Sequence, residues 1–288
     1  MDAHDLFCSE TCEPIGLTQD KKISLSEHLE TLSMLLEKED RQKLNIHPNY
    51  IQTIQINGME SEWRQKLCHW MFDLGNHYDF PQDVIASAVH YMDQYLSMES
   101  LDKTSIQLLS ITCLFIASKM HISSPICMEE IYLLTSNMFS DKSVFQMEAN
   151  ITKKLRWKLN PLTSFAFARL FLNILDYNES STIWNRVMQT LEKIHELYAF
   201  VGYKNSYIAL VAIQMACYEI TPIEENIQVI IDTIQFKSRS NMIYILQVLS
   251  DIKMILKGEC IHYTNTHKIS SFDRNVSKLD LLIMLLSN

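Results

Sequence analysis

The chain has 288 residues, 47% of them hydrophobic, and its 25 Lys and Arg against 34 Asp and Glu give a formal net charge of −9. That length accommodates one large domain or two of ordinary size, each with a well-developed core. The acidic balance excludes most nucleic-acid-binding proteins and polybasic membrane anchors, because both bind through clustered positive charge. We therefore expect neither nucleic acid nor membrane among the partners.

The composition also favours helices over sheets. Five glycines and six prolines are few for this length, and tight turns between strands need more. The seven cysteines are scattered without a CxxC pair, which suits reduced thiols in the cytosol or nucleus. The first residues, MDAHDLFCSE, lack the charged-then-apolar order of a signal peptide. We expect an all-α, soluble protein of the nucleus and cytoplasm.

The N-terminal part divides into a tail and a helix. Residues 1–24 are polar, acidic and without a clear period, which predicts a disordered tail. A helical pattern of leucines then begins at Ser24 or Ser26 and fades by Arg41.

Further helical patterns follow in close succession from residue 61 to residue 160. Their ranges are Trp63–Leu74, Val84–Leu96, Lys103–His121, Met128–Leu134 and a last one that is capped by Asp141 or Ser143 and reaches Leu155. The loops between them are short enough to make consecutive helices neighbours in space. These residues are therefore expected to form one five-helix domain.

The third of these patterns, Lys103–His121, is expected to be the central helix. Between Ile106 and Ser118 nine of thirteen residues are apolar, and they fall on every side of a 3.6-residue period. A bilayer span needs about 20 apolar residues, so this helix is too short to cross a membrane. Asp102 or Thr104 is its expected N-cap.

The helical pattern then restarts. Its segments are Ser164–Leu175, Thr182–Phe200, Ser206–Tyr218, Ile223–Ile234 and Asn241–Leu256. The restart predicts two five-helix domains in tandem, the first with the N-terminal helix in residues 25–160 and the second in residues 161–258. The remaining tail, 259–288, ends in an apolar run, LDLLIMLL, that is a candidate for a short docking helix.

Four short motifs carry a resemblance to a known family. WRQKLCHW at 63–70 parallels MRxILxDW, YMDQYLS at 91–97 parallels YxDRFLS, ASKM at 117–120 parallels LASKxEE, and QME at 146–148 with LRWKLN at 155–160 parallels RME and LxWxLxxxT. In this order and spacing, residues 61–160 resemble a cyclin box, and the motif residues are most similar to those of the D-type (G1) cyclins. The resemblance implies tandem cyclin folds and a kinase-regulating function.

Residues Leu6, Cys8 and Glu10 form an LxCxE match in the expected tail. In D-type cyclins this motif docks on retinoblastoma-family proteins. The chemistry is reasonable, since an extended segment presents Leu and Cys to apolar slots while Glu meets a positive site. The alternative is a chance match in an acidic tail.

Lys119 and Glu148 resemble the two cyclin residues that contact the kinase backbone. An ammonium donates to carbonyl oxygens and a carboxylate accepts from amides, so both recognise a backbone without a matching side chain. The alternatives are a lysine at a helix end that reaches water and a solvated glutamate. Met120, Trp157 and Leu159 are the expected apolar neighbours in this interface, unless they belong to the core.

A second expected surface lies on the first helix of the box. Its members are Trp63, Lys66, Leu67 and Trp70 at i, i+3, i+4 and i+7, together with Asp73 and Gln107. In cyclins the corresponding patch recruits substrates or inhibitors that carry an RxL motif. Here Trp63 replaces a Met and Lys66 replaces an Ile or Val, which alters the groove. The alternative is ordinary packing of surface and core.

Two more positions follow from the resemblance. Arg64 and Asp93 resemble the ion pair that ties the first two helices of the box together, a structural role. His121-Ile122 stands where the family has an acidic pair, so one commonly acidic contact position is lost.

These observations predict a regulatory subunit without catalysis of its own. No P-loop, GxGxxG, GxSxG or HExxH motif occurs, so we expect no catalytic residue and no cofactor. We also expect no metal, because Cys260, His262 and His267 lack a fourth ligand. The expected function is that of a D-type-like cyclin that binds and activates a cyclin-dependent Ser/Thr kinase and targets it to retinoblastoma-type substrates at G1/S. Three alternatives are a transcription-type cyclin-fold protein, a degenerate cyclin that does not activate its kinase, and a helical small-molecule enzyme.

Overall fold

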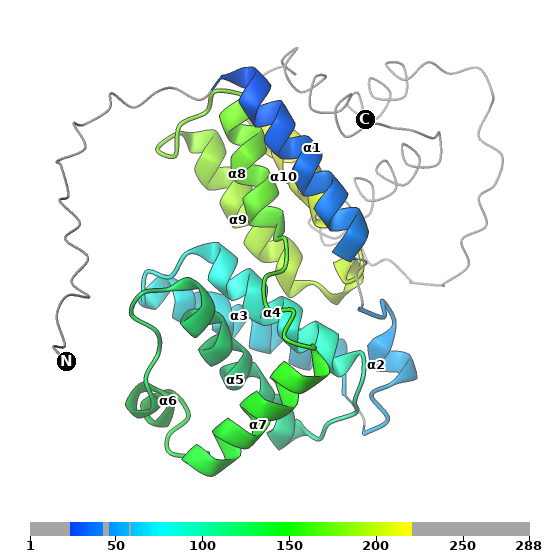
Figure 1. Ribbon diagram of the computed structural model, residues 1–288, viewed down its shortest axis with the longest axis vertical. Coiled ribbons are helices and arrows are strands. Elements are labelled where there is room, and N and C mark those ends of the chain that lie inside the picture. Colours follow the sequence, from blue (N-terminus) through cyan, green and yellow to red (C-terminus); the bar gives the residue numbers. More distant parts are fainter. Residues whose placement is uncertain (1–23, 43–45, 58, 221–288) are drawn as a thin grey trace, which may run out of the picture.

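The computed structural model describes residues 24–42, 46–57 and 59–220, and within these ranges all regular structure is helical (Figure 1). In chain order the helices are α1 (Leu25–Gln42), α2 (Tyr50–Thr53), α3 (Ser61–His77), α4 (Gln82–Leu96), α5 (Lys103–His121), α6 (Met128–Leu134), α7 (Asp141–Lys154), α8 (Ser164–Ile174), α9 (Thr182–Glu196), the short 3-10 helix η1 (Tyr198–Phe200) and α10 (Asn205–Ile220). The prediction of an all-α fold is confirmed.

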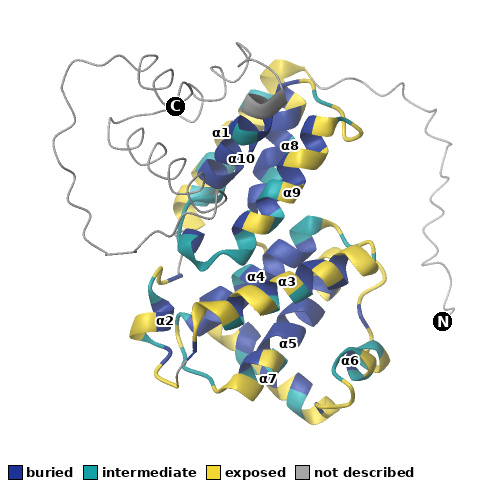
Figure 2. Ribbon diagram, turned by 180° about the vertical axis from the view of Figure 1, so that it is seen from behind, coloured by how far each residue is buried: buried dark blue, intermediate teal, exposed yellow. Residues whose placement is uncertain are grey.

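Helices α3 to α7 form one group, with α5 at its centre (Figure 1). Helix α5 covers the predicted range Lys103–His121 and is capped by Asp102, whose carboxylate accepts the Ser105 N–H at 2.8 Å. Every residue from 109 to 118 is buried, as expected for a helix that is apolar all round. Helices α3, α4 and α7 pack against it, and the exposed residues of the group lie mainly on its outer faces (Figure 2).

Helix α7 begins as predicted but with a different cap. Neither Asp141 nor Ser143 caps it, so that prediction is wrong. Ser140 takes the role, and its Oγ accepts the Ser143 N–H at 3.3 Å. Because Ser, Asp and Thr all cap well, a run such as Ser140-Asp141 leaves the choice to tertiary packing.

Helix α9 ends earlier than predicted. The pattern extends to Phe200, whereas the helix ends at Glu196 and a 3-10 turn follows from Tyr198. The cause lies outside the helix, because the Arg64 guanidinium of α3 donates to the carbonyl oxygens of His195 and Glu196 at 3.0 Å each. These bonds satisfy the last carbonyls of α9 and allow the chain to turn.

Helix α1 packs against the second group of helices, α8 to α10, although helices α2 to α7 separate them in the sequence (Figure 1). At the start of α10 the Glu39 carboxylate accepts the N–H of Ser206 at 3.0 Å and its hydroxyl at 2.5 Å. Lys204 also pairs with Asp40 at 2.6 Å. A carboxylate at the first turn of a helix is stabilised by the free N–H groups there. These contacts therefore hold the end of α1 against the N-terminus of α10.

Several predicted segments lie outside the described residues. They are nearly all of the N-terminal tail, the helices at 223–234 and 241–256, and the C-terminal tail with its apolar run. Within the described ranges no helix combines the length and the apolar character that crossing a bilayer requires.

Candidate functional site

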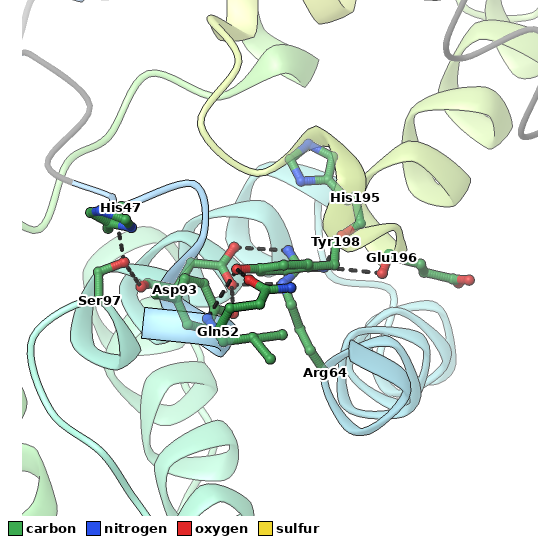
Figure 3. A network of polar contacts seen from close by, with 10 residues as sticks. His47, Gln52, Arg64, Asp93, Ser97, His195, Glu196 and Tyr198 are labelled. Carbon is green, nitrogen blue, oxygen red and sulfur yellow. Dashed lines mark hydrogen bonds and ion pairs between the residues drawn. The ribbon is translucent and has the colours of Figure 1, made fainter. Parts of the chain in front are cut away.

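A buried polar cluster joins the group α3 to α7 to the second group of helices (Figure 3). Arg64 of α3 donates from Nε and Nη2 to the two carboxylate oxygens of Asp93 on α4, at 2.7 and 2.8 Å. Its Nη1 reaches the end of α9, as described above. Burial alone would lower the pKa of Arg64, but the Asp93 carboxylate holds it well above its ordinary value. The predicted ion pair is therefore present, and it connects three helices, not two.

Two tyrosines extend this cluster. The Tyr50 hydroxyl donates to Asp93 Oδ1 at 2.9 Å, and burial followed by the Asp93 charge raises the pKa of Tyr50 well above its ordinary value. The Tyr198 hydroxyl accepts the N–H of Ile51 at 3.0 Å, and the two tyrosine rings meet edge to face at 5.2 Å. Sequence reasoning missed these contacts, because neither tyrosine stands in a motif.

Two histidines line a cavity of about 50 Å³ beside this cluster. His195 Nε2 lies 2.7 Å from Ser164 Oγ, and burial lowers the pKa of His90 and of His195 to about 4. The space suffices for a few water molecules. Both imidazoles are therefore neutral at pH 7, and the cavity belongs to the contact between the two helical groups.

The structure brings Lys119 and Glu148 together. They come from the end of α5 and the middle of α7, and the ammonium forms an ion pair with the carboxylate. The Lys119 side chain is 36% exposed and that of Glu148 is 23% exposed. The ammonium also lies 3.9 Å from the centroid of the Phe115 ring, a cation–π contact. The pair is thus held in place at the surface and remains accessible.

The apolar neighbours predicted for this surface separate into two kinds. Met120 and Trp157 are 51% and 75% exposed, as an interface residue must be before its partner binds. Leu159 is 4% exposed and belongs to the core, and its carbonyl accepts the Tyr91 hydroxyl. Phe145, which sequence reasoning missed, is 49% exposed one turn before Glu148 on α7. An aromatic residue three positions before the glutamate was the available signal.

The turn after α7 holds its backbone in an uncommon conformation. Arg156 and Trp157 have φ angles of +52° and +58°, the left-handed region that side chains with a Cβ rarely adopt. The Trp157 N–H donates to the carbonyl of Thr152, which closes the turn at the C-terminus of α7. This backbone is one reason why a large indole stands exposed next to the helix.

The second predicted surface is also assembled. Trp63, Leu67 and Trp70 are half-buried along one face of α3, and Lys66, Asp73 and Gln107 are exposed around them. The Lys103 ammonium of α5 lies 5.2 Å from the centroid of the Trp63 ring. We call these residues, with Lys103, the α3 patch.

Some of the other predicted residues lie outside the described ranges, and the rest lie at the end of α5 or just after it. The LxCxE residues Leu6, Cys8 and Glu10 lie outside the described residues, as does the Cys260, His262 and His267 set. Within the described ranges, no group of three His, Cys, Asp or Glu side chains is arranged to hold a metal ion. His121, the last residue of α5, is exposed, and Ile122 after it is half-buried, so no acidic side chain follows Met120 there.

Comparison with known proteins shows what part of this chain is similar to. Residues 30–160 match the cyclin N-terminal domain family. The structure is similar to that of a viral cyclin from herpesvirus saimiri, with a TM-score of 0.62 and 17% identity, over 81% of this chain and 97% of that one. Residues 30–160 therefore match a cyclin N-terminal domain, and the described residues have the cyclin fold.

The chain is also similar to curated G1/S-specific cyclins. G1/S-specific cyclin-D1 of Danio rerio is 31% identical over 178 residues, which are 62% of this chain and 59% of that protein. G1/S-specific cyclin-D1 of Homo sapiens is 30% identical over 143 residues, 49% of this chain and 48% of that protein. The matches thus span about half to three fifths of these relatives. They confirm the similarity to the D-type cyclins.

Proposed function

We propose that this chain is a D-type-like cyclin, a regulatory subunit that binds and activates a cyclin-dependent Ser/Thr protein kinase. The observation that carries the proposal is the accessible Lys119–Glu148 pair between α5 and α7, together with the exposed Met120 near the end of α5 and the exposed Trp157 in the turn after α7. In this proposal the kinase supplies the catalytic residues, ATP and magnesium, so the chain is no enzyme and needs no cofactor. Its location is the nucleus and cytoplasm.

The Lys119–Glu148 pair is suited to forming hydrogen bonds with a partner's backbone. The Lys119 ammonium has three donors and the Glu148 carboxylate about four acceptor positions, and their mutual contact uses one of each. Both groups keep capacity for the carbonyl and amide groups of a docked helix end. Because the ion pair and the Phe115 ring already hold the ammonium, less side-chain freedom is lost on binding.

Activation follows from a shift between two kinase conformations. Docking on this surface holds the αC helix of the kinase in the position where its Glu pairs with the Lys of strand β3, and it frees the activation loop. The cyclin stabilises the active conformation only as far as it binds that conformation more tightly.

Substrate choice is proposed to come from the tail. Leu6, Cys8 and Glu10 form the motif that would deliver retinoblastoma-type proteins to the bound kinase at the G1/S transition. Replacing all three by Ala should leave phosphorylation of a short peptide substrate unchanged and reduce phosphorylation of a retinoblastoma-type fragment. Equal loss on both substrates would contradict a docking role for the motif.

The kinase interface is tested by capture from a lysate of the protein's own cells. Wild type is compared with the double variant Lys119→Ala/Glu148→Ala, and captured kinase is assayed on a retinoblastoma-type C-terminal fragment. A matched control is Glu99→Ala/Lys154→Ala, which removes another exposed pair, 2.5 Å in length, whose lysine lies at the end of α7. We expect active kinase with wild type and control and none with the first variant.

A degenerate cyclin is the second candidate. It is favoured by His121-Ile122, because no carboxylate follows Met120 where the family has an acidic pair. Capture of a kinase that stays inactive would support this alternative. Failure of the folded wild-type chain to capture any kinase would overturn both candidates and favour a transcription-type cyclin-fold protein.

A further inference from the structure

The α3 patch has an apolar floor of three side chains. Trp63, Leu67 and Trp70 lie on one face of α3 and are half-buried, so each leaves part of its surface to solvent while packing on the core. Indole rings offer a large, rigid contact area at small entropic cost and dominate many protein interfaces. Such a floor offers apolar contact to a leucine side chain from a partner.

Two lysines border this floor. Lys66 is exposed on α3, and Lys103 is exposed on α5 with its ammonium 5.2 Å from the Trp63 ring centroid. The cation–π contact fixes the Lys103 charge directly beside the apolar surface. Within the described structure Lys66 forms no ion pair, not even with Glu62, which lies one turn before it on α3.

The acid of the patch is already engaged. Asp73 Oδ2 lies 3.3 Å from His69 Nε2, and the other ring nitrogen of His69 lies 2.9 Å from Glu196 Oε1 of α9. The hydrogen bond to the Glu196 carboxylate raises the pKa of His69, and the charge of Asp73 acts in the same direction. A basic residue arriving at Asp73 must therefore compete with an imidazole that carries part of a positive charge near neutral pH.

We infer that the α3 patch selects an extended peptide that carries a leucine next to acidic residues, in place of the basic RxL type. This inference rests on the proposed function, since it takes the patch to be a docking site of the regulatory subunit. The carboxylate of such a peptide pairs with Lys103 while the ammonium stays on the Trp63 ring, and a second carboxylate meets Lys66. An Arg in the same place faces two ammonium groups.

The test is fluorescence polarisation with the full chain and three labelled ten-residue peptides. One carries Glu-Ala-Leu, one carries Arg-Ala-Leu, and one carries Glu-Ala-Ala in an otherwise identical frame. We expect the Glu-Ala-Leu peptide to bind at least about threefold more tightly than the Arg-Ala-Leu peptide, the order expected from two surface charge pairs. Loss of the leucine should remove most binding.

The charge variant Lys66→Glu/Lys103→Glu should reverse the preference between the two leucine peptides. The control Lys38→Glu/Lys142→Glu makes the same change in net charge at exposed positions of α1 and α7, and it should leave the preference unchanged. Circular dichroism of both variants establishes that they are folded.

Tighter binding of the Arg-Ala-Leu peptide to wild type, equal binding of the two leucine peptides, or no binding of any peptide overturns the inference. Kinase capture separates this result from the proposed function. The Lys66→Glu/Lys103→Glu variant should still capture kinase, because its changes lie outside the Lys119–Glu148 surface. A wild-type chain that binds the acidic peptide but captures no kinase would refute the proposed function and leave the peptide preference standing.

Discussion

Replacing Asp93 by Asn should destabilise the fold more than any conservative change at the surface. Arg64 and Asp93 are 2% and 4% exposed, and the Asp93 carboxylate accepts two bonds from Arg64 and one from Tyr50. The amide keeps the shape of the carboxylate but removes its charge, which leaves the Arg64 cation buried without a counter-ion. Breaking a buried pair in this way costs about 3–5 kcal/mol.

The assay is urea unfolding followed by far-UV circular dichroism, with the midpoints of wild type and Asp93→Asn compared at equal slope. Tyr50→Phe should cost about 1 kcal/mol, and the double variant less than the sum, because both residues share one hydrogen bond. Asp40→Asn, which breaks the exposed pair with Lys204, should cost less than about 1 kcal/mol. A loss below about 1 kcal/mol for Asp93→Asn would refute the assigned role of the buried pair.

Three further predictions concern stability. The pKa of His90 and of His195 is about 4 in the folded chain against an ordinary value near 6.5. The contribution of these histidines to stability is therefore full above pH 6.5, and up to about 3 kcal/mol per histidine is lost as the pH falls toward 4. Urea unfolding at several pH values tests this, and His90→Gln should flatten the pH dependence. Arg156→Gly should raise the free energy of unfolding by up to about 1 kcal/mol, because Gly adopts a positive φ without strain. Lys153→Gly within α7 should lower it by a similar amount, because Gly is a poor helix former. Gly75→Ala should cost about 1–3 kcal/mol although Ala favours helices, because its Cβ would lie 2.5 Å from Ile85 Cδ1; a neutral result would mean that Ile85 moves aside freely.

The helices of the box could be predicted because their apolar periods are strong. The range of α5 follows from its sequence, since a segment that is apolar on every side, with an Asp at its start and a Pro soon after its end, admits few other structures. The end of α9 could not be found in the same way. Its pattern continues to Phe200, and the residue that ends the helix, Arg64, lies more than a hundred positions earlier.

The two candidate surfaces could also be predicted only in part. Spacing places Trp63, Leu67 and Trp70 on one helical face, and the structure agrees. Spacing gives no information about Lys103, which comes to Trp63 from a different helix. Nor does it separate Trp157 from Leu159, because a two-residue step after a helix depends on the turn between them. The left-handed backbone at Trp157 exposes the indole, while Leu159 returns to the core.

The buried cluster around Arg64 gives the α3 patch its position. Arg64 follows Trp63 directly and points inward, where its guanidinium contacts α4 and the end of α9. The exposed and the buried faces of α3 are thus fixed by the same turn of helix. Glu196, whose carbonyl accepts from Arg64, also holds His69 through its carboxylate. A change in the contact between the two helical groups would therefore reach Asp73 through Glu196 and His69, and with it the charge that a docked peptide meets.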